Sequence, residues 1–351
     1  MDGHVEFGIG TFGDLTVDEQ GRPLTAAQTL RNIVEQAELA DQLGLDYIGV
    51  GEHHRKEFSV SAPDVMLAAI AARTSRIKLG TAVVVLSTDD PVRVLERFST
   101  LQALSDGRAE LTVGRGSFTE SFPLFGFDLA QYEELFSERL ELLAALRGGG
   151  PVTWQGRTRA PLTAGVIHPP FEKPLPVWVG VGGSPESVIR AARYGLGLML
   201  AVIGGSPQRF APYVDLYHRA MEQFGFPAGP VGMHSPGHVA DDAEQARDDA
   251  WRYSQALMAS IGRERGWAPR PRESFDAETG PHGAQFVGDP EQVASKIAAA
   301  VRDLGLTRFE LKYSGGTLPH PKLLRSIELY ATKVVPRVRE LLAEPGADRV
   351  C

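Results

Sequence analysis

The fold is decided by the stretch YIGVGEHH, residues 47–54, where a short apolar segment runs directly into a glutamate and two histidines. Residues 47–51 have the apolar character of a parallel strand that is covered on both faces. Because side chains alternate along a strand, Gly49, Gly51 and His53 share one face. The sequence therefore predicts a buried strand with a hollow along its glycine face, in which a flat ligand could lie below His53.

Similar β-rich segments alternate with helical patterns along almost the whole chain. Strands are predicted near residues 5–12, 47–51, 77–86, 109–114, 177–181, 198–203, 231–239 and 309–313. Helices are predicted between them, near residues 26–43, 64–74, 91–104, 132–147, 185–194, 207–224 and 241–261. This alternation requires parallel strands, and eight of them suffice to close a barrel. We therefore expect an α/β fold, a (β/α)8 TIM barrel with insertions.

Two segments interrupt the alternation, residues 148–176 and 263–289, both rich in Pro and Gly. Loops of this length are usually lids or binding elements, and a surface excursion without a role is the alternative of equal weight. Since no linker divides the chain, we expect a single barrel domain over residues 1–342. Residues 343–351 lack apolar periodicity and are predicted to form a disordered tail.

Composition excludes several classes of protein. The chain has 351 residues, a formal net charge of −8 and a single cysteine, Cys351. The acidic balance argues against a nucleic-acid surface, and no segment approaches the roughly 18 apolar residues of a membrane span or has the pattern of a signal peptide. We expect a cytoplasmic protein with neither nucleic acid nor membrane as partner. A lone terminal cysteine argues against disulfides and thiol catalysis, so redox chemistry would require a cofactor.

His53 and His54 follow the second predicted strand, at the end of the barrel where active sites lie. Adjacent residues of a strand point to opposite sides, so the two rings are poorly placed to chelate one ion, and no metal site is expected. A neutral histidine near its ordinary pKa of about 6.5 is well suited to moving a proton. The alternative is that both rings are hydrogen-bonded plugs at the barrel mouth.

Two further motifs indicate an anion site. Arg115 lies between two glycines at the end of the fourth strand. This position suits an arginine that binds a phosphate, and the alternative is an arginine that forms a salt bridge inside the barrel mouth. After the fifth strand comes GGSPES, residues 182–187, where Ser184 can cap a helix and direct its free N–H groups toward an anion. The Gly-rich stretch YSGGT, residues 313–317, is the second choice for such a site.

Several stretches, taken in order, resemble the bacterial luciferase-like flavin-dependent monooxygenases, and most closely their alkanal-oxidising subunits. They are Glu52-His53-His54, IKLGTAVVVLSTDDPVRVLE at 77–96, LSDGRAELTVGRGSF at 104–118 and FPLFGFD at 122–128. The resemblance is specific over about residues 47–130 and more diffuse afterwards. It implies a (β/α)8 barrel that binds FMN at its C-terminal mouth.

The resemblance also implies roles for individual residues. His53 matches a catalytic histidine beside the flavin, as general base or hydrogen-bond partner, and Glu52 belongs to the same cofactor-binding motif. Ala82 and Val83 fall where related proteins hold a non-proline cis peptide under the isoalloxazine ring. The phosphate-binding residues implied by the resemblance are Arg115, Ser184 and Ser187, and Gly182 and Gly183 beside them allow close backbone approach to the cofactor.

The sequence departs from the family pattern at three positions. Gly114 replaces a reactive cysteine, Asp90 replaces a second histidine, and Glu133 stands near where a further phosphate-contacting arginine is expected. These departures argue against useful light emission from long-chain aldehydes. Oxygenation of a small organic substrate is the expected activity.

The resemblance thus implies a two-component monooxygenase that uses O₂ and reduced FMN from a separate flavin reductase to oxygenate an aldehyde or similar substrate. A deazaflavin-dependent oxidoreductase and a non-catalytic flavin-binding protein are the alternatives. A homodimer is expected through the helices at 63–72 and 91–104, and the alternative is that the apolar spacing of the first helix packs it only on its own barrel. Substrate choice would depend on the two insertions and on Phe118, Phe122, Phe125 and Phe127, whose spacing fits an apolar wall or, equally, core positions.

Overall fold

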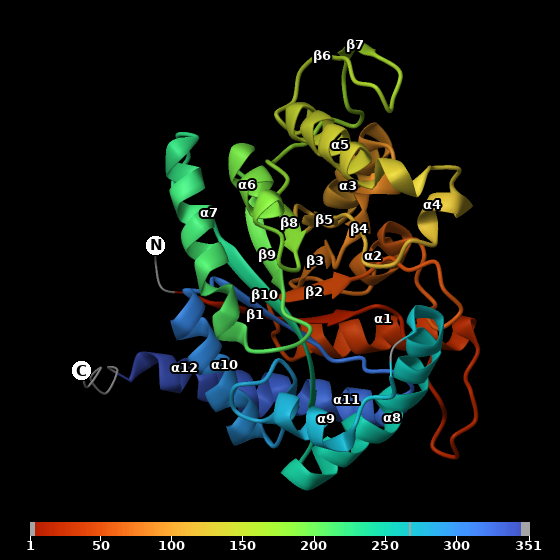
Figure 1. The fold of residues 1–351 in the computed structure, drawn as a ribbon, viewed down its shortest axis with the longest axis vertical. Coiled ribbons are helices and arrows are strands. Elements are labelled where there is room, and N and C mark those ends of the chain that lie inside the picture. The colour runs from red at the N-terminus through yellow and green to blue at the C-terminus, as the bar shows by residue number, and fades with distance from the viewer. Residues whose placement is uncertain (1–3, 267, 345–351) are drawn as a thin grey trace.

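The computed structural model describes residues 4–266 and 268–344, which form a parallel barrel surrounded by helices (Figure 1). Neighbouring strands along one path follow the order β3-β2-β1-β12-β10-β9-β8-β5-β4, and all of these pairs are parallel. The strands are β1 (Glu6–Thr11), β2 (Tyr47–Val50), β3 (Lys78–Thr81), β4 (Val84–Val85), β5 (Leu111–Gly114), β8 (Val177–Val181), β9 (Gly197–Ala201), β10 (Val231–Val239) and β12 (Arg308–Lys312).

The two ends of this path meet, because β3 and β4 are consecutive pieces of the chain separated only by Ala82 and Val83. β4 pairs with β5, and an isolated parallel bridge joins Leu79 of β3 to Ala109, just before β5. The result is a nearly closed parallel barrel. This confirms the predicted α/β barrel class.

The helices lie around the barrel, and several begin at a residue that caps them. Side chains of Thr25, Asp90, Ser184, Asp242 and Asp289 each accept a hydrogen bond from the first turn of the helix that follows. The helices are α1 (Ala26–Gln42), α2 (Pro63–Ala71), α3 (Pro91–Leu104), α4 (Ser121–Leu124), α5 (Tyr132–Arg147), α6 (Pro185–Arg193), α7 (Ala211–Gln223), α8 (Ala243–Arg265), α9 (Arg272–Thr279), α10 (Pro290–Leu304), α11 (His320–Leu329) and α12 (Val335–Ala343).

The prediction of one continuous third strand over 77–86 is wrong. The strand breaks between β3 and β4. Here Glu52, in the loop after β2, makes the hydrogen bonds to Val83 and Val85 that a neighbouring strand would otherwise make. The N–H of Glu52 donates to the carbonyl of Val83 at 3.3 Å, and its carboxylate accepts from the N–H of Val85 at 2.8 Å. The loop after β2 is therefore fastened to the break.

Both predicted excursions contain regular structure that the Pro- and Gly-rich sequence concealed. The first holds an antiparallel hairpin of β6 (Val152–Trp154) and β7 (Leu162–Gly165). The second begins with the last turn of α8, which Gly266 terminates in a left-handed conformation, and continues through α9 to β11 (Phe286–Gly288), which pairs with β10. The predicted tail lies outside the described residues, apart from Ala343, which ends α12, and Glu344.

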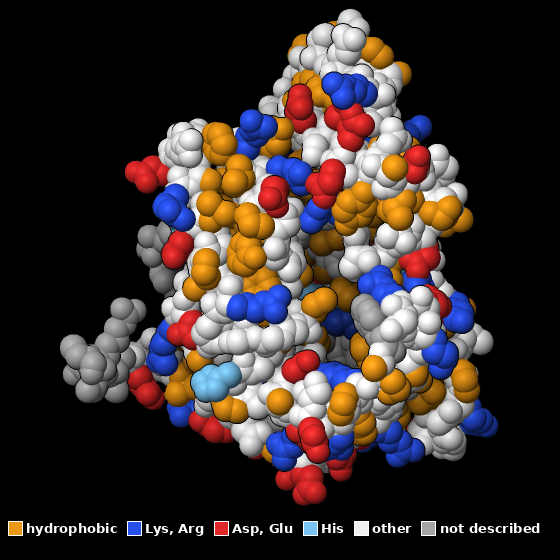
Figure 2. Space-filling model, in the orientation of Figure 1, with side chains coloured by type: hydrophobic (Ala, Val, Ile, Leu, Met, Phe, Trp, Pro, Cys, Tyr) orange, Lys and Arg blue, Asp and Glu red, His pale blue; other side chains and the backbone are white. Residues whose placement is uncertain are grey.

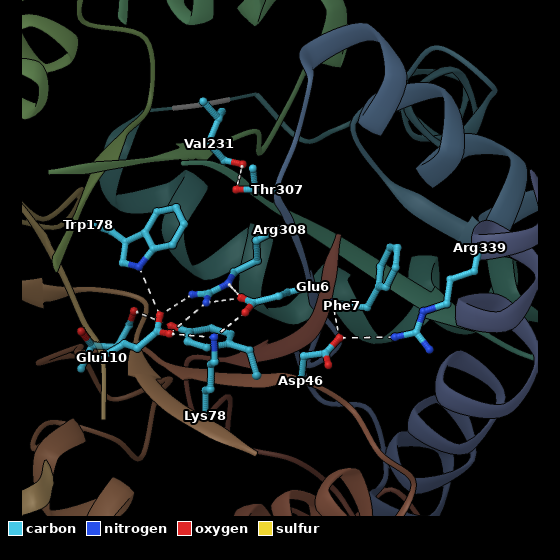
Figure 3. A network of polar contacts seen from close by, with 12 residues as sticks. Glu6, Phe7, Asp46, Lys78, Glu110, Trp178, Val231, Thr307, Arg308 and Arg339 are labelled. Carbon is cyan, nitrogen blue, oxygen red and sulfur yellow. Dashed lines mark hydrogen bonds and ion pairs between the residues drawn. The ribbon is translucent and has the colours of Figure 1, made fainter. Parts of the chain in front are cut away.

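The amino ends of the strands form what we call the closed end of the barrel, which is filled by a network of paired charges (Figure 3). Arg308 is 1% exposed and donates to Glu6 at 2.8 Å and to Glu110 at 2.7 Å. Its guanidinium lies 4.3 Å from the ring of Tyr47 and 4.7 Å from that of Trp178. The two carboxylates raise the pKa of Arg308 further above its ordinary value, against the effect of burial. This end of the barrel is therefore sealed.

Candidate active site

The carboxyl ends of the strands, the open end of the barrel, border a hollow. Figure 2 shows this depression near the centre of the face in view, with hydrophobic side chains along its rim. Gly180 of β8 and Ala201 of β9 are partly exposed although they belong to barrel strands. Ala82 and Val83 are also partly exposed, and a Cβ on Gly180 would lie 3.0 Å from a methyl carbon of Val83. Ile203, just after β9, is 65% exposed. This end of the barrel is accessible to a ligand.

The predicted hollow along the glycine face of β2 is wrong. A Cβ atom on Gly49 would lie 2.5 Å from Oε1 of Glu310, and one on Gly51 would lie 2.5 Å from the ring of Phe12. Glu310 and Phe12 therefore fill the space that the sequence leaves open. Free space lies instead after β8, where a Cβ on Gly182 would meet nothing within 4 Å.

His53 lies in a cage of phenylalanine rings. Its ring centroid is 4.7 Å from that of Phe12, 4.3 Å from that of Phe58 and 5.2 Å from that of Phe118. Its Nε2 atom is buried and has no hydrogen-bond partner among the described residues. Burial disfavours the charged imidazolium and lowers the pKa of His53 from its ordinary value of about 6.5 to about 3. The ring is neutral at pH 7 and has an unused polar atom.

Glu52 holds the neighbouring backbone in place. Its Oε1 lies 2.8 Å from Nε2 of His54, while its Oε2 accepts the N–H of Val85. Both carboxylate oxygens are thus engaged within the protein. The structure gives Glu52 a positioning role for the segment between β3 and β4, and His54 is held as its partner, next to the ring of Phe125.

The peptide bond between Ala82 and Val83 is cis, in agreement with the resemblance. The methyl groups of Val83 lie over two glycines on neighbouring strands. A Cβ on Gly114 would come within 2.7 Å of one methyl carbon, and a Cβ on Gly180 within 3.0 Å of the other. This packing explains why position 114 carries no side chain, where the resemblance expects a cysteine.

Arg115 is one of two arginines that share a carboxylate. It forms an ion pair with Glu133 of α5, and Nη2 of Arg190 lies 2.8 Å from the other oxygen of Glu133. The Nη1 atom of Arg190 is buried without a partner in the described part of the chain. Arg190 was missed in the sequence because nothing distinguishes it from a solvent-exposed arginine of α6. The sequence offered one indication: Arg190 follows Ser187 by three residues, so the two side chains lie on the same face of the helix.

The first turn of α6 carries the remaining predicted residues. Ser184 caps the helix by accepting the N–H of Ser187 at 3.3 Å, and its hydroxyl donates to Glu186 at 2.7 Å. Gly182 is exposed, and Gly183 has a φ of 128°, which favours glycine. The hydrogen bond from Ser184 lowers the pKa of Glu186, with smaller contributions from the charges of Arg190 and Arg115. Glu133 thus links Arg115 to Arg190 of α6, the helix that Ser184 caps, that contains Ser187 in its first turn, and that Gly182 and Gly183 precede.

The second-choice anion site at residues 313–317 is occupied by the protein itself. The carboxylate of Asp14 accepts from the N–H of Gly316 at 3.1 Å and from the hydroxyl of Ser314 at 2.6 Å. The N–H of Thr317 donates to the carbonyl of Tyr253 at 3.0 Å. This Gly-rich turn therefore closes on internal acceptors.

The predicted apolar wall does not form as one surface. Phe118 faces His53, whereas Phe122 is fully buried against the ring of Tyr132. Phe125 is 48% exposed, and Phe127 lies 4.3 Å below the guanidinium of Arg139. Of the four, Phe118 is the one that lines the cage.

A histidine–carboxylate pair inside the barrel was also missed. Nδ1 of His234 lies 2.9 Å from Oε1 of Glu310, and its Nε2 is buried without a partner within the described ranges. The ring of Phe12 stacks on His234 at 5.4 Å and contacts His53 on its other side. Sequence reasoning treated β10 and β12 as plain buried strands, although a histidine or glutamate inside such a strand signals a buried polar pair.

Over residues 4–266 and 268–344, no group of three or more His, Cys, Asp or Glu side chains is arranged to hold a metal ion. None of the helices in the same ranges has the length and apolar character needed to span a membrane.

The nearly closed parallel barrel, with Arg115 and Arg190 sharing Glu133 near the carboxyl ends of its strands, makes the chain an α/β-barrel protein. Residues 10–308 match the luciferase-like monooxygenases, so the chain belongs to this family, as the resemblance predicted.

An uncharacterised protein of Sinorhizobium fredii is 25% identical over 94% of this chain and 97% of that protein. The 4-hydroxyprotoasukamycin monooxygenase of Streptomyces nodosus is 32% identical, over 65% of each chain. The alkanal monooxygenase alpha chain of Photorhabdus luminescens is 27% identical, over 61% of this chain and 59% of that one.

Solved structures show the same fold. The monooxygenase RslO1 from Streptomyces bottropensis has a TM-score of 0.82 at 24% identity, covering 95% of this chain and 99% of that one. The oxygenating constituent of a diketocamphane monooxygenase from Pseudomonas putida, solved with FMN, has a TM-score of 0.76 at 17% identity, over 95% and 99% of the chains. An F420-dependent secondary alcohol dehydrogenase has a TM-score of 0.74 at 19% identity, over 96% and 99%. The fold therefore accommodates both cofactors.

Proposed function

We propose that the protein is an FMN-dependent monooxygenase that uses O₂ and reduced FMN, delivered by a separate flavin reductase, to oxygenate a small organic substrate. One observation carries the proposal. Around the open end of one barrel lie two arginines that share a carboxylate, a partly exposed backbone segment at Ala82 and Val83, and a half-buried imidazole whose Nε2 is buried and unused. Relatives named as monooxygenases support oxygenation as the reaction class.

The residues present fit FMN. Its phosphate matches Arg115, Arg190 and the first turn of α6, where an arginine Nη1 lacks an acceptor and Gly182 leaves the backbone open. A planar ring matches the partly exposed surface of Val83 and Gly180, which offers no polar side chain of its own. These residues would hold the cofactor, which supplies the electrons for O₂ activation when it is bound in reduced form.

His53 would hold a hydrogen bond to the reacting ligand rather than act as a resting general base. With a pKa near 3, its ring binds a proton at pH 7 only while negative charge develops beside it. Phe12, Phe58 and Phe118 keep water from the ring, and exclusion of water limits wasteful release of H₂O₂. Glu52 would act indirectly, by fixing the backbone between β3 and β4 against which the ring lies.

Two alternatives use the same site differently. A deazaflavin-dependent oxidoreductase would transfer hydride without O₂, and its candidacy rests on the shared fold of F420-dependent enzymes. A flavin-binding protein without turnover would bind FMN but leave O₂ consumption unchanged. The buried, unpartnered Nε2 of His53 favours a catalytic role over binding without turnover.

The test compares cofactors and then turnover. The protein is titrated with FMN, riboflavin and F420, followed by flavin or tryptophan fluorescence. It is then supplied with NADH, a flavin reductase, FMN and a panel of aliphatic aldehydes, while O₂ consumption, H₂O₂ and carboxylic acid are measured. We expect FMN to bind and an aldehyde to lower the H₂O₂ released per NADH, whereas His53→Ala binds FMN but loses most of this coupling. Binding of F420 in preference to FMN, or equal H₂O₂ with and without the protein, would contradict the proposal.

A homodimer through α2 and α3 is part of the proposal. Leu104 of α3 is 70% exposed and Val65 of α2 is 65% exposed, which leaves apolar groups for a partner. Met66 and Ile70, by contrast, are buried against the protein's own barrel. Sedimentation of the protein and of Val65→Asp tests this arrangement, with a monomeric variant expected.

A further inference from the structure

The carboxylate of Glu133 lies between two guanidinium groups that come from different elements. Arg115 follows β5 and pairs with Oε1, whereas Arg190 of α6 approaches Oε2 at 2.8 Å. Each carboxylate oxygen therefore has its own arginine. Two arginines that share one anion in this way form the arrangement that suits a phosphate group.

Arg190 belongs to α6, so it connects this trio with the helix that Ser184 caps. The positive charges of Arg190 and Arg115 both contribute to lowering the pKa of Glu186, which lies in that turn and accepts a hydrogen bond from Ser184. In addition, Nη1 of Arg190 is buried and, over the described residues, has no acceptor. The site thus has more donors than Glu133 can satisfy.

We propose that Glu133 is a built-in occupant of the phosphate site, which neutralises Arg115 and Arg190 until the phosphate of FMN displaces it. This inference rests on the proposed function. The resemblance expects an arginine near position 133, on α5. Here α5 supplies an acid instead, and Arg190 of α6 supplies the second phosphate-binding arginine.

The surroundings of Glu133 favour displacement. Its side chain is 54% exposed, so its carboxylate can turn into water. It also lies in the first turn of α5, whose positive helix end stabilises a carboxylate that has left the arginines. A phosphate monoester carries nearly two negative charges at pH 7 and matches two arginines better than one carboxylate does. FMN therefore binds in competition with an internal anion, as an exchanging cosubstrate.

The test measures affinity for FMN and for riboflavin, which lacks the phosphate, in wild type, Glu133→Gln and Arg190→Gln. We expect Glu133→Gln to bind FMN about tenfold more tightly and Arg190→Gln about tenfold more weakly, since one charge-assisted contact is gained or lost. Riboflavin affinity stays the same in all three. Glu134→Gln is the matched control, because Glu134 lies in the same turn and its oxygen is 3.3 Å from Arg157 instead.

An FMN affinity that Glu133→Gln leaves unchanged or lowers overturns the inference. So does an equal gain for riboflavin, because the effect would then not act through the phosphate. If the wild-type protein binds neither flavin, the proposed function itself is contradicted. If FMN binds equally well with and without the Glu133 carboxylate, only this inference is contradicted. Circular dichroism and thermal unfolding show that each variant is folded before it is titrated.

Discussion

At the closed end of the barrel Arg308 lies between two carboxylates and two aromatic rings, whereas at the open end His53 lies among phenylalanine rings with a nitrogen unused. The guanidinium of Arg308 and the Nε2 atom of His53 are both buried, which is costly unless such polar atoms are paired. The closed end meets this cost with internal partners. The open end leaves its hydrogen bond unmade, which is expected where a ligand completes the site.

The largest expected difference is in the free energy of unfolding that is lost when Arg308 at the closed end or Arg115 at the open end is replaced. Arg308→Met leaves Glu6 and Glu110 without their buried partner and is expected to lower the free energy of unfolding by about 3 to 5 kcal/mol. Arg115→Met removes a pair whose carboxylate is 54% exposed and should cost under about 1 kcal/mol. Urea unfolding at pH 7 measures both. Equal losses would remove the distinction between the two ends.

The same comparison can be made with glycines. A Cβ on Gly8 would lie 2.7 Å from the carbonyl oxygen of Tyr47, so Gly8→Ala forces the backbone apart and should cost about 1 to 3 kcal/mol. A Cβ on Gly182 meets nothing, so Gly182→Ala should change stability by under about 0.5 kcal/mol. Urea unfolding of the pair checks this. A large loss for Gly182→Ala would show that the space after β8 is not open.

Acid stability gives a smaller, pH-dependent difference at His53. The unfolded chain binds a proton on this histidine near pH 6.5 and the folded chain only near pH 3, so lowering the pH through this interval favours unfolding. At pH 5 the loss is about 2 kcal/mol relative to pH 8, since one pKa unit is worth about 1.4 kcal/mol. His53→Phe lacks this loss. Parallel pH profiles for wild type and variant would show that His53 is solvated.

Much of the fold was predictable because strands and helices each space their apolar residues with a characteristic period. The barrel class and most of its strands followed from that spacing. The break at Ala82 and Val83 could not be seen, because it depends on hydrogen bonds from Glu52, a residue of another loop. The β11 strand and α9 were hidden because short elements in Pro- and Gly-rich segments carry too few periodic positions.

Several residues of the candidate site could be named from the sequence, but the shape of the space between them could not. Arg115 and the turn at Ser184 carry local signals, a flanking glycine pair and a helix cap, and Glu133 links Arg115 to Arg190 on the helix that Ser184 caps. Arg190 carries no such signal, since its meaning arises only from the approach of Glu133 on another helix. The glycine hollow beside His53 failed as a prediction because Phe12 and Glu310, distant in sequence, fill it.

The most direct test is a crystal structure of the protein soaked with oxidised FMN. We predict the phosphate between Arg115, Arg190 and the first turn of α6, the ring against the Ala82–Val83 peptide, and the carboxylate of Glu133 turned toward solvent. FMN bound elsewhere, or a hollow that stays free of FMN at saturating concentration, would contradict the assignment of the open end as the flavin site.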